Sequence, residues 1–238
     1  MKRFIILMAS AVILLVSCNN KVDTDYYIIS GKEMGTIENG VFTSDKAIKM
    51  NIKSAPDGCD INTKRRVMIY FLLKTDGQLT SYDINISNLV ETVTVEPIVS
   101  EKAEDSPEGD PMNLVESWFG GGYLNMIAFY YTDPNKNTEQ VFTSSYTCKE
   151  SMSSIAIRRD GKGEGYFSVE DAAESYSYIC IPMEKIWDDF FDPEPGDPQA
   201  GRSMPVNLNW IWHVVSDNVL LPDTVAKNAQ GIYYADQD

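Results

Sequence analysis

Cysteine and histidine are the side chains of this sequence best suited to nucleophilic or metal chemistry, and there are few of them. The chain holds four cysteines and a single histidine, His213. A cysteine nucleophile needs a base and a group that orients the base, and none of Cys59, Cys148 and Cys180 has histidine and aspartate companions in that pattern. The sequence therefore predicts no catalytic residues, no metal site and no cofactor, and we expect a protein that is not an enzyme.

The fourth cysteine, Cys18, follows a short apolar segment at the start of the chain. A Lys-Arg pair precedes the apolar run 4–16, and polar residues follow Cys18 directly. This is the pattern of a secretory signal, and it is shorter than the roughly 20 apolar residues that a membrane span needs. The end of the run, LVSC, resembles the bacterial lipobox. That resemblance implies cleavage between Ser17 and Cys18 and lipidation of Cys18.

A lipidated Cys18 places the protein at the cell envelope. Buried acyl chains contribute about 0.8 kcal/mol per methylene, so several of them hold a domain on a membrane without a spanning helix. We expect a signal peptide at 1–17, a lipidated flexible tether at 18–25, and an outer-membrane lipoprotein that is periplasmic or surface-exposed. The membrane is then a partner through the lipid anchor. The alternative is that Cys18 ends an uncleaved apolar tail.

The three remaining thiols allow at most one disulfide. Cys180 lies in the apolar strand pattern YSYICIP, where cysteine commonly packs as a small buried hydrophobe. We favour this interpretation over a bridge between Cys148 and Cys180, and both stay open at this point.

Acidic residues are concentrated in two stretches of the second half. The larger one runs from Asp188 through Asp192 and Glu194 to Asp197, and the smaller one lies within 105–110. Calcium takes about six to eight oxygen ligands, but neither stretch has the alternating spacing of a calcium loop, so we expect solvated loops. Facing carboxylates can also hydrolyse glycosides, and the sequence does not give their separation.

Three consecutive glycines, Gly120, Gly121 and Gly122, lie between Trp118 and Tyr123. No lysine followed by serine or threonine comes after them, and no helix pattern follows, so they do not form a phosphate-binding loop. We expect a bulge or kink, in which positive φ angles let the next strand start at a sharp angle against the Trp118 ring.

The net charge of the chain is strongly negative, at −15. Removal of residues 1–17 takes away Lys2 and Arg3 and no acid, which gives −17. Such a domain is repelled by phosphate backbones. We therefore expect no nucleic-acid partner, and cationic partners are the weaker alternative to a charge that serves solubility.

Short β-strands account for the first half of the chain. Asn39-Gly40 between apolar residues is a strong hairpin signal, residues 47–52 alternate, and the long apolar run 66–74 turns back into 79–99. No amphipathic helix interrupts these strands. The pattern predicts a small OB-like β-barrel over 26–99. Since it lacks a basic stripe, we favour a structural module over an oligonucleotide binder.

The second half of the chain predicts a β-sandwich. A charged linker or loop at 100–110 separates it from the barrel, and turn residues at 132–137 and 160–163 predict two hairpins. Apolar residues at helical spacing predict one short helix within 182–191. The expected fold class is all-β, a barrel followed by a sandwich over 111–238.

The stretch from Trp118 to Asn125 (WFGGGYLN) resembles a motif of the NigD-like lipoproteins. Together with the lipobox, the acidic tether and the tyrosine-rich first strand, the likeness extends loosely over most of the mature chain. It implies an N-terminal OB-like domain, a C-terminal β-sandwich and a suggested role in bacteriocin immunity. It supplies no catalytic residues.

These observations favour an envelope-anchored lipoprotein with a non-enzymatic binding role, in one version bacteriocin immunity, and a protein or glycan partner. The alternative is a glycan-binding or polysaccharide-processing accessory protein with weak hydrolase activity. The candidate contact surface combines the glycine stretch with the acidic loop after the helix. Its residues are Trp118, Gly120, Gly121, Gly122, Tyr123, Asp192, Glu194 and Asp197.

Overall fold

The computed structural model describes residues 27–75, 82–101, 109–136, 139–162, 168–193, 201–216, 219–222 and 227–234. The expected signal and tether, including Ser17 and Cys18, lie outside these residues. Within them, no helix is long and apolar enough to cross a membrane.

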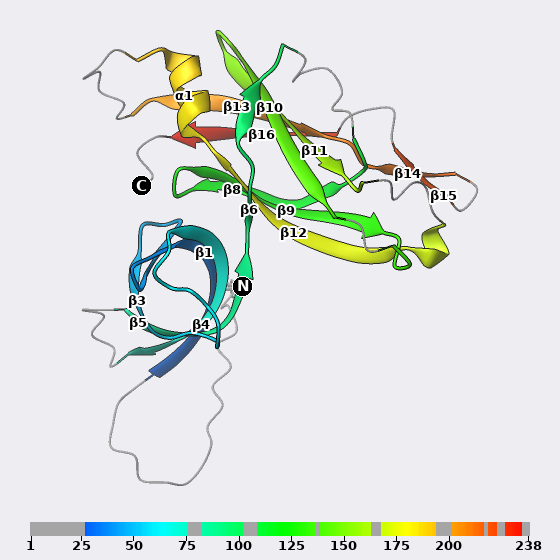
Figure 1. Ribbon diagram of the computed structural model, residues 1–238. Helices are drawn as coiled ribbons and strands as arrows, with labels where there is room; N and C mark the ends of the chain where they lie inside the picture. The colour runs from blue at the N-terminus through cyan, green and yellow to red at the C-terminus, as the bar shows by residue number, and fades with distance from the viewer. Residues whose placement is uncertain are drawn as a thin grey trace, which may run out of the picture.

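Five strands form a closed barrel in the first half of the chain, in the order β1-β2-β3-β5-β4 (Figure 1). Their bounds are β1 Tyr27–Glu38, β2 Val41–Ser44, β3 Lys49–Ser54, β4 Arg65–Thr75 and β5 Asp83–Glu91. The long strand β1 pairs with both β2 and β4, which closes the sheet on itself. Among the residues that the structure describes, nine buried apolar side chains fill the barrel, including Ile37, Phe42 and Ile69. The predicted OB-like barrel is confirmed.

The turn between β1 and β2 is the hairpin that Asn39-Gly40 predicts. Glu38 pairs with Val41 across a loop of two residues, and Asn39 and Gly40 have φ angles of 50° and 76°. Positive φ at both central positions matches the right-handed twist of the flanking strands.

The segment after the barrel belongs to the sandwich rather than to the barrel. Two short strands, β6 (Val93–Thr94) and β7 (Pro97–Val99), follow β5. Strand β6 pairs in parallel with residues 179–180, and β7 pairs in parallel with 144–146. The barrel strands thus end at Glu91, whereas the sequence led us to expect barrel residues up to 99.

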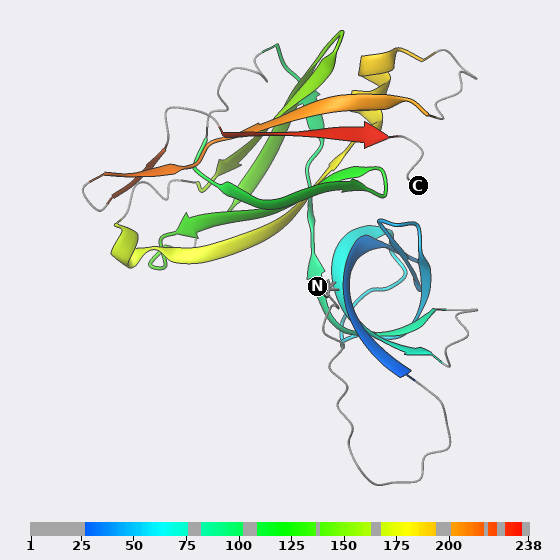
Figure 2. The same cartoon turned by 180° about the vertical axis from the view of Figure 1, so that it is seen from behind.

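Two sheets enclose the core of the second half (Figures 1 and 2). One sheet has the order β6-β12-β9-β8 and the other β16-β13-β11-β10-β7. The further strands are β8 Asn113–Gly120, β9 Tyr123–Thr132, β10 Val141–Lys149, β11 Met152–Asp160, β12 Ala173–Pro182, β13 Ser203–Trp210, β14 His213–Ser216, β15 Val219–Pro222 and β16 Lys227–Tyr234. Buried residues of both sheets form one apolar cluster, which includes Met126, Ile155 and Ile179. The chain is therefore a barrel followed by a sandwich, as predicted.

The hairpin predicted around 132–137 is wrong, because its two strands belong to different sheets. Strand β9 pairs with β8 and β12, and β10 pairs with β7 and β11. The rings of Tyr130 and Phe142 pack 5.8 Å apart, so these strands face each other across the core. Most of the second strand of the hairpin predicted around 160–163 lies outside the described residues, and within them β11 is flanked by β10 and β13.

The predicted helix is present as α1, Glu184–Phe191, with Ile186 and Trp187 buried. A 3-10 turn, η1, spans Val169–Asp171. The N–H of Met183, which precedes α1, donates to the Gly122 carbonyl at 3.0 Å. This bond ties the start of the helix to the glycine stretch.

The three cysteines that the structure describes, Cys59, Cys148 and Cys180, are all free. Cys180 is fully buried, in agreement with the favoured interpretation as a small hydrophobe. Burial raises the pKa of the Cys180 thiol, and it also raises the pKa of Cys148.

Candidate functional site at the junction of the two domains

The glycine stretch forms the turn of a β-hairpin. Gly120 at the end of β8 pairs with Tyr123 at the start of β9, and Gly121 and Gly122 between them have φ angles of 58° and 77°. The positive φ angles agree with the expectation. The expected bulge or kink at the glycines is corrected, because two consecutive residues of positive φ make a tight hairpin turn.

This turn lies against a buried ion pair of the barrel. Asp45 follows β2, and Arg66 is the second residue of β4. The Arg66 Nη2 donates to Asp45 Oδ1 at 2.6 Å, and the two side chains are only 4% and 8% exposed. A buried charge is costly unless hydrogen bonds replace its lost hydration, so the remaining lone pairs of Asp45 need donors.

The sandwich supplies those donors. The Trp118 Nε1–H donates to Asp45 Oδ2 at 2.9 Å, and the Asn125 amide donates to the same oxygen at 3.0 Å. The Arg66 Nη2 also donates to Asn125 Oδ1 at 2.7 Å, and its guanidinium lies 4.5 Å from the centre of the Tyr123 ring. We call these five residues, Asp45, Arg66, Trp118, Tyr123 and Asn125, the interdomain clasp.

The clasp needs glycine at the turn. A Cβ atom on Gly120 would lie 2.6 Å from the Asp45 Cβ, and one on Gly121 would lie 2.8 Å from the Arg66 Nη1. Any side chain at these positions would push the hairpin away from the ion pair.

An apolar patch continues the contact between the domains. Met34 and Met68 of the barrel and Cys180 of β12 are buried together, and the Cys180 Sγ lies 3.7 Å from the Met34 Sδ. The two domains thus share a small core of their own beside the clasp.

A groove borders the clasp on the side of strand β8. It has a volume of about 430 Å³, and both domains contribute to its walls. Lys32, Met34 and Lys46 come from the barrel, whereas Glu116 and Ile127 come from the sandwich. Ligand sites commonly occupy about 300–1,000 Å³ and are frequent at domain interfaces.

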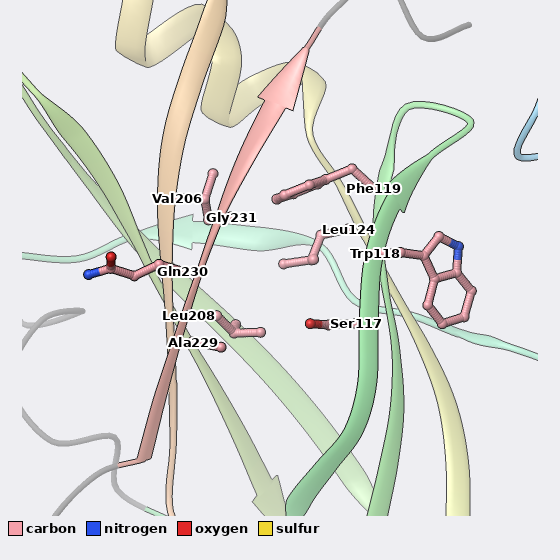
Figure 3. A pocket seen from close by; sticks show the side chains of 9 residues that line it. All are labelled: Ser117, Trp118, Phe119, Leu124, Val206, Leu208, Ala229, Gln230 and Gly231. Carbon is pink, nitrogen blue, oxygen red and sulfur yellow. The ribbon is translucent and has the colours of Figure 1, made fainter. Parts of the chain in front are cut away.

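A smaller slot of about 130 Å³ opens on the other face of β8. Figure 3 shows Ser117, Phe119 and Leu124 pointing into it opposite Val206 and Leu208, while Trp118 points away on the far side of β8. The slot lies between the edge strands β8 and β16.

The structure brings together part of the candidate contact surface. Trp118, Gly120, Gly121 and Tyr123 meet at the clasp, facing the barrel, and Gly122 bonds to the start of α1. Asp192 is exposed at the other end of α1, where it caps the helix with a φ angle of 45°. Glu194 and Asp197 lie outside the described residues.

The four tryptophans do not gather in one cleft. Trp187 and Trp210 are buried in the sandwich core, and Trp212 joins an aromatic cluster on the outer face of the four-stranded sheet. The cluster contains Phe129, Tyr131, Tyr176, Trp212 and His213. Among the described residues, no group of three or more His, Cys, Asp or Glu side chains is arranged to hold a metal ion.

No sequence pattern singles out Asp45 or Arg66. Aspartate is common in a turn between two strands. An arginine at the start of an apolar strand usually extends its side chain into solvent. Asn125 did offer a signal, since it is the polar member of a strand face that otherwise carries Tyr123, Ile127 and Phe129.

A closed barrel clasped to a sandwich defines a class of two-domain β proteins. A solved structure similar to this chain is a NigD-like immunity protein from Bacteroides caccae ATCC 43185, with a TM-score of 0.63 and 19% sequence identity over 87% of this chain and 97% of that chain. A candidate toxin-related protein from Parabacteroides distasonis ATCC 8503 has a TM-score of 0.57 and 12% identity over 90% of this chain and 96% of that one.

A candidate lipoprotein from Bacteroides fragilis NCTC 9343 has a TM-score of 0.52 and 11% identity over 86% of this chain and 98% of that chain. No family model matches the chain, and no curated protein matches it. The chain therefore has the fold of a NigD-like immunity protein over most of its length, as the sequence resemblance implied.

We predict that Asp45→Ala lowers the free energy of unfolding by about 3–5 kcal/mol, because it leaves the Arg66 charge buried without its carboxylate. Urea denaturation followed by tryptophan fluorescence measures this loss. The double variant Asp45→Ala, Arg66→Met should lose less than the two single variants together, because it removes both buried charges.

The matched control for this prediction is the neighbouring residue Lys46. Its exposed ion pair with Glu33 spans 3.3 Å, so Lys46→Ala should cost less than about 1 kcal/mol. If Asp45→Ala is as mild as Lys46→Ala, the clasp does not hold the domains together.

Proposed function

We propose that this chain is a cell-envelope lipoprotein that acts by binding a partner and not by catalysis. The observation that carries the proposal is the groove of about 430 Å³ between the two docked domains. Its walls belong to different domains that a buried ion pair fixes to one another. A rigid, preformed concave site reduces the entropy lost when a partner binds.

The buried charged groups beside the groove, Asp45 and Arg66, are committed to structure. The Asp45 carboxylate accepts bonds from Arg66, Trp118 and Asn125 at once. A general acid or base must instead reach a substrate proton within hydrogen-bond distance. Asp45 and Arg66 therefore serve as supports for the groove.

Attachment to the envelope rests on Cys18 and on the LVSC stretch. The solved protein from Bacteroides fragilis is described as a candidate lipoprotein, which supports this part of the proposal. An outer-membrane position, periplasmic or surface-exposed, brings the groove to partners outside the cytoplasm.

The specific version that we favour is immunity to a bacteriocin. The Bacteroides caccae protein is described as a NigD-like immunity protein, which supports this version. The net charge of −15 favours association with a cationic partner, since opposite charge accelerates encounter.

Replacement of the lipidated residue tests the anchor. We expect Cys18→Ala to move the protein from the membrane to the soluble envelope fraction and to abolish palmitate labelling, because no acyl chain can then be attached. Cys59→Ala, which changes a free cysteine outside the signal, should change neither result. A Cys18→Ala protein that still sediments with membranes and takes up palmitate contradicts the anchor.

Deletion of the gene tests the immunity version. We expect the deleted strain to become sensitive to toxins released by neighbouring strains, and the intact gene, but not its Asp45→Ala variant, to restore resistance if the clasp shapes the binding groove. Growth inhibition in co-culture measures the effect. Unchanged sensitivity after deletion counts against immunity, while leaving a binding role for other partners intact.

The second candidate function is glycan binding, and the aromatic cluster favours it. Tyr131 and Trp212 stack with ring centres 6.0 Å apart, and Tyr176 is 57% exposed beside Phe129. A row of rings on a sheet face presents apolar surface to a sugar. Weak hydrolase activity gains no such support, because α1 with its acids and β14 beside Trp212 lie at opposite ends of the sandwich (Figures 1 and 2).

Affinity electrophoresis in gels that contain envelope polysaccharides tests this candidate. We expect Tyr176→Ala and Trp212→Ala to abolish retardation, because each removes a ring from the row. Ile232→Ala changes a comparably exposed apolar residue on β16 and serves as control. Equal migration of all four proteins in every gel rejects glycan binding by the cluster.

A further inference from the structure

The sandwich is closed along one margin and open along the other. The chain crosses from one sheet to the other through β6 and β7, which closes the first margin. At the second margin, β8 is hydrogen-bonded to β9 alone and β16 to β13 alone within the described residues. Figure 2 shows these two edge strands running along the same side.

Successive side chains of β8 point to opposite faces of its sheet. Ser117 and Phe119 are opposite the buried residues Met126 and Leu124, so they face the other sheet and the slot. Glu116 and Trp118 face the barrel and the groove. One edge strand therefore separates two cavities.

The backbone of this edge is open to another strand. Every second residue of an antiparallel edge strand directs its N–H and C=O groups away from its neighbour, and residues 115–117 are exposed. Proteins protect such edges with proline, lysine or bulges. The β8 bulge lies between Leu114 and Glu116, and the five residues after it, ESWFG, contain neither proline nor lysine.

We propose that the edge of β8 binds an extended segment of a partner polypeptide as an added strand, in which aliphatic and basic residues alternate. This proposal rests on the proposed binding function and names the chemistry of the partner. An added strand gains backbone hydrogen bonds, and its alternate side chains enter pockets on the two faces.

The slot and the groove determine why aliphatic and basic side chains should alternate along the added strand. A side chain opposite Ser117 enters the slot, whose volume of about 130 Å³ is close to that of an apolar cavity of about 150 Å³ that admits benzene. A side chain opposite Glu116 enters the groove beside an exposed carboxylate, which favours lysine or arginine as a cross-strand pair. The negative charge of the chain attracts the same basic segment.

A labelled eight-residue peptide of alternating lysine and valine is the probe, and fluorescence anisotropy with the whole chain in detergent measures its binding. We expect a saturable signal that is lost when alternate backbone amides of the peptide are N-methylated, since those amides can no longer donate. Ala229→Leu, which fills the slot, should weaken binding by roughly tenfold or more.

Charge reversal separates strand addition from general attraction to an acidic protein. Glu116→Lys should turn the preference from the lysine peptide to its glutamate counterpart, whereas Glu139→Lys, which reverses another exposed acid, should not. Unchanged thermal unfolding of each variant shows that it is folded. The proposal is overturned if the N-methylated peptide binds equally well, or if Ala229→Leu and Glu116→Lys leave the affinity unchanged.

Two further outcomes bear on the partner. Self-association of the chain through β8 that excludes the peptide overturns the assignment to a foreign segment. A bacteriocin that binds the wild type, Ala229→Leu and Glu116→Lys equally well leaves the proposed binding function standing and overturns only the role of the β8 edge.

Discussion

The ion pair between Asp45 and Arg66 is the interaction on which the arrangement of the molecule depends. Two buried charges at 2.6 Å are tolerated only where further hydrogen bonds replace the water that they lose. The barrel alone does not supply them, because the second oxygen of Asp45 is satisfied by Trp118 and Asn125 of the sandwich. The buried carboxylate of Asp45 therefore selects the one docking geometry in which both domains supply its hydrogen bonds. A buried polar group in a coiled coil fixes the register of the helices in the same way.

Local patterns in the sequence predicted a hairpin turn and the helix, because each of these is formed by residues that are close together in the chain. The Asn39-Gly40 turn needs positive φ at two adjacent positions, and the helix α1 needs apolar residues at helical spacing, so a few residues suffice for each. The pairing of β9 with β12 could not be predicted in this way. Alternation shows that a strand has a buried face, but it does not show which sheet the strand joins.

The candidate site shows the same difference between local features, which the sequence predicts, and long-range contacts, which it does not. The stretch from Trp118 to Asn125 stood out in the sequence, and the structure brings most of it together at one place. Its partner Asp45 lies 73 residues before Trp118 and 80 before Asn125, and no periodic pattern relates residues at such separations. The motif therefore indicated the position of a specialised stretch of the chain. Only the fold shows that the direct contacts of this stretch are with the barrel.

Strand β8 links the clasp to the cavities on either side of it. The indole of Trp118 is bonded to the barrel, and Trp118 and Phe119 both line the groove as well as the slot. Since glycines at 120 and 121 let the hairpin approach the ion pair, they also set how far β8 stands from the barrel. The width of the groove is thus fixed by the clasp, so the proposed binding site is already ordered without a partner, which reduces the entropy that binding would cost.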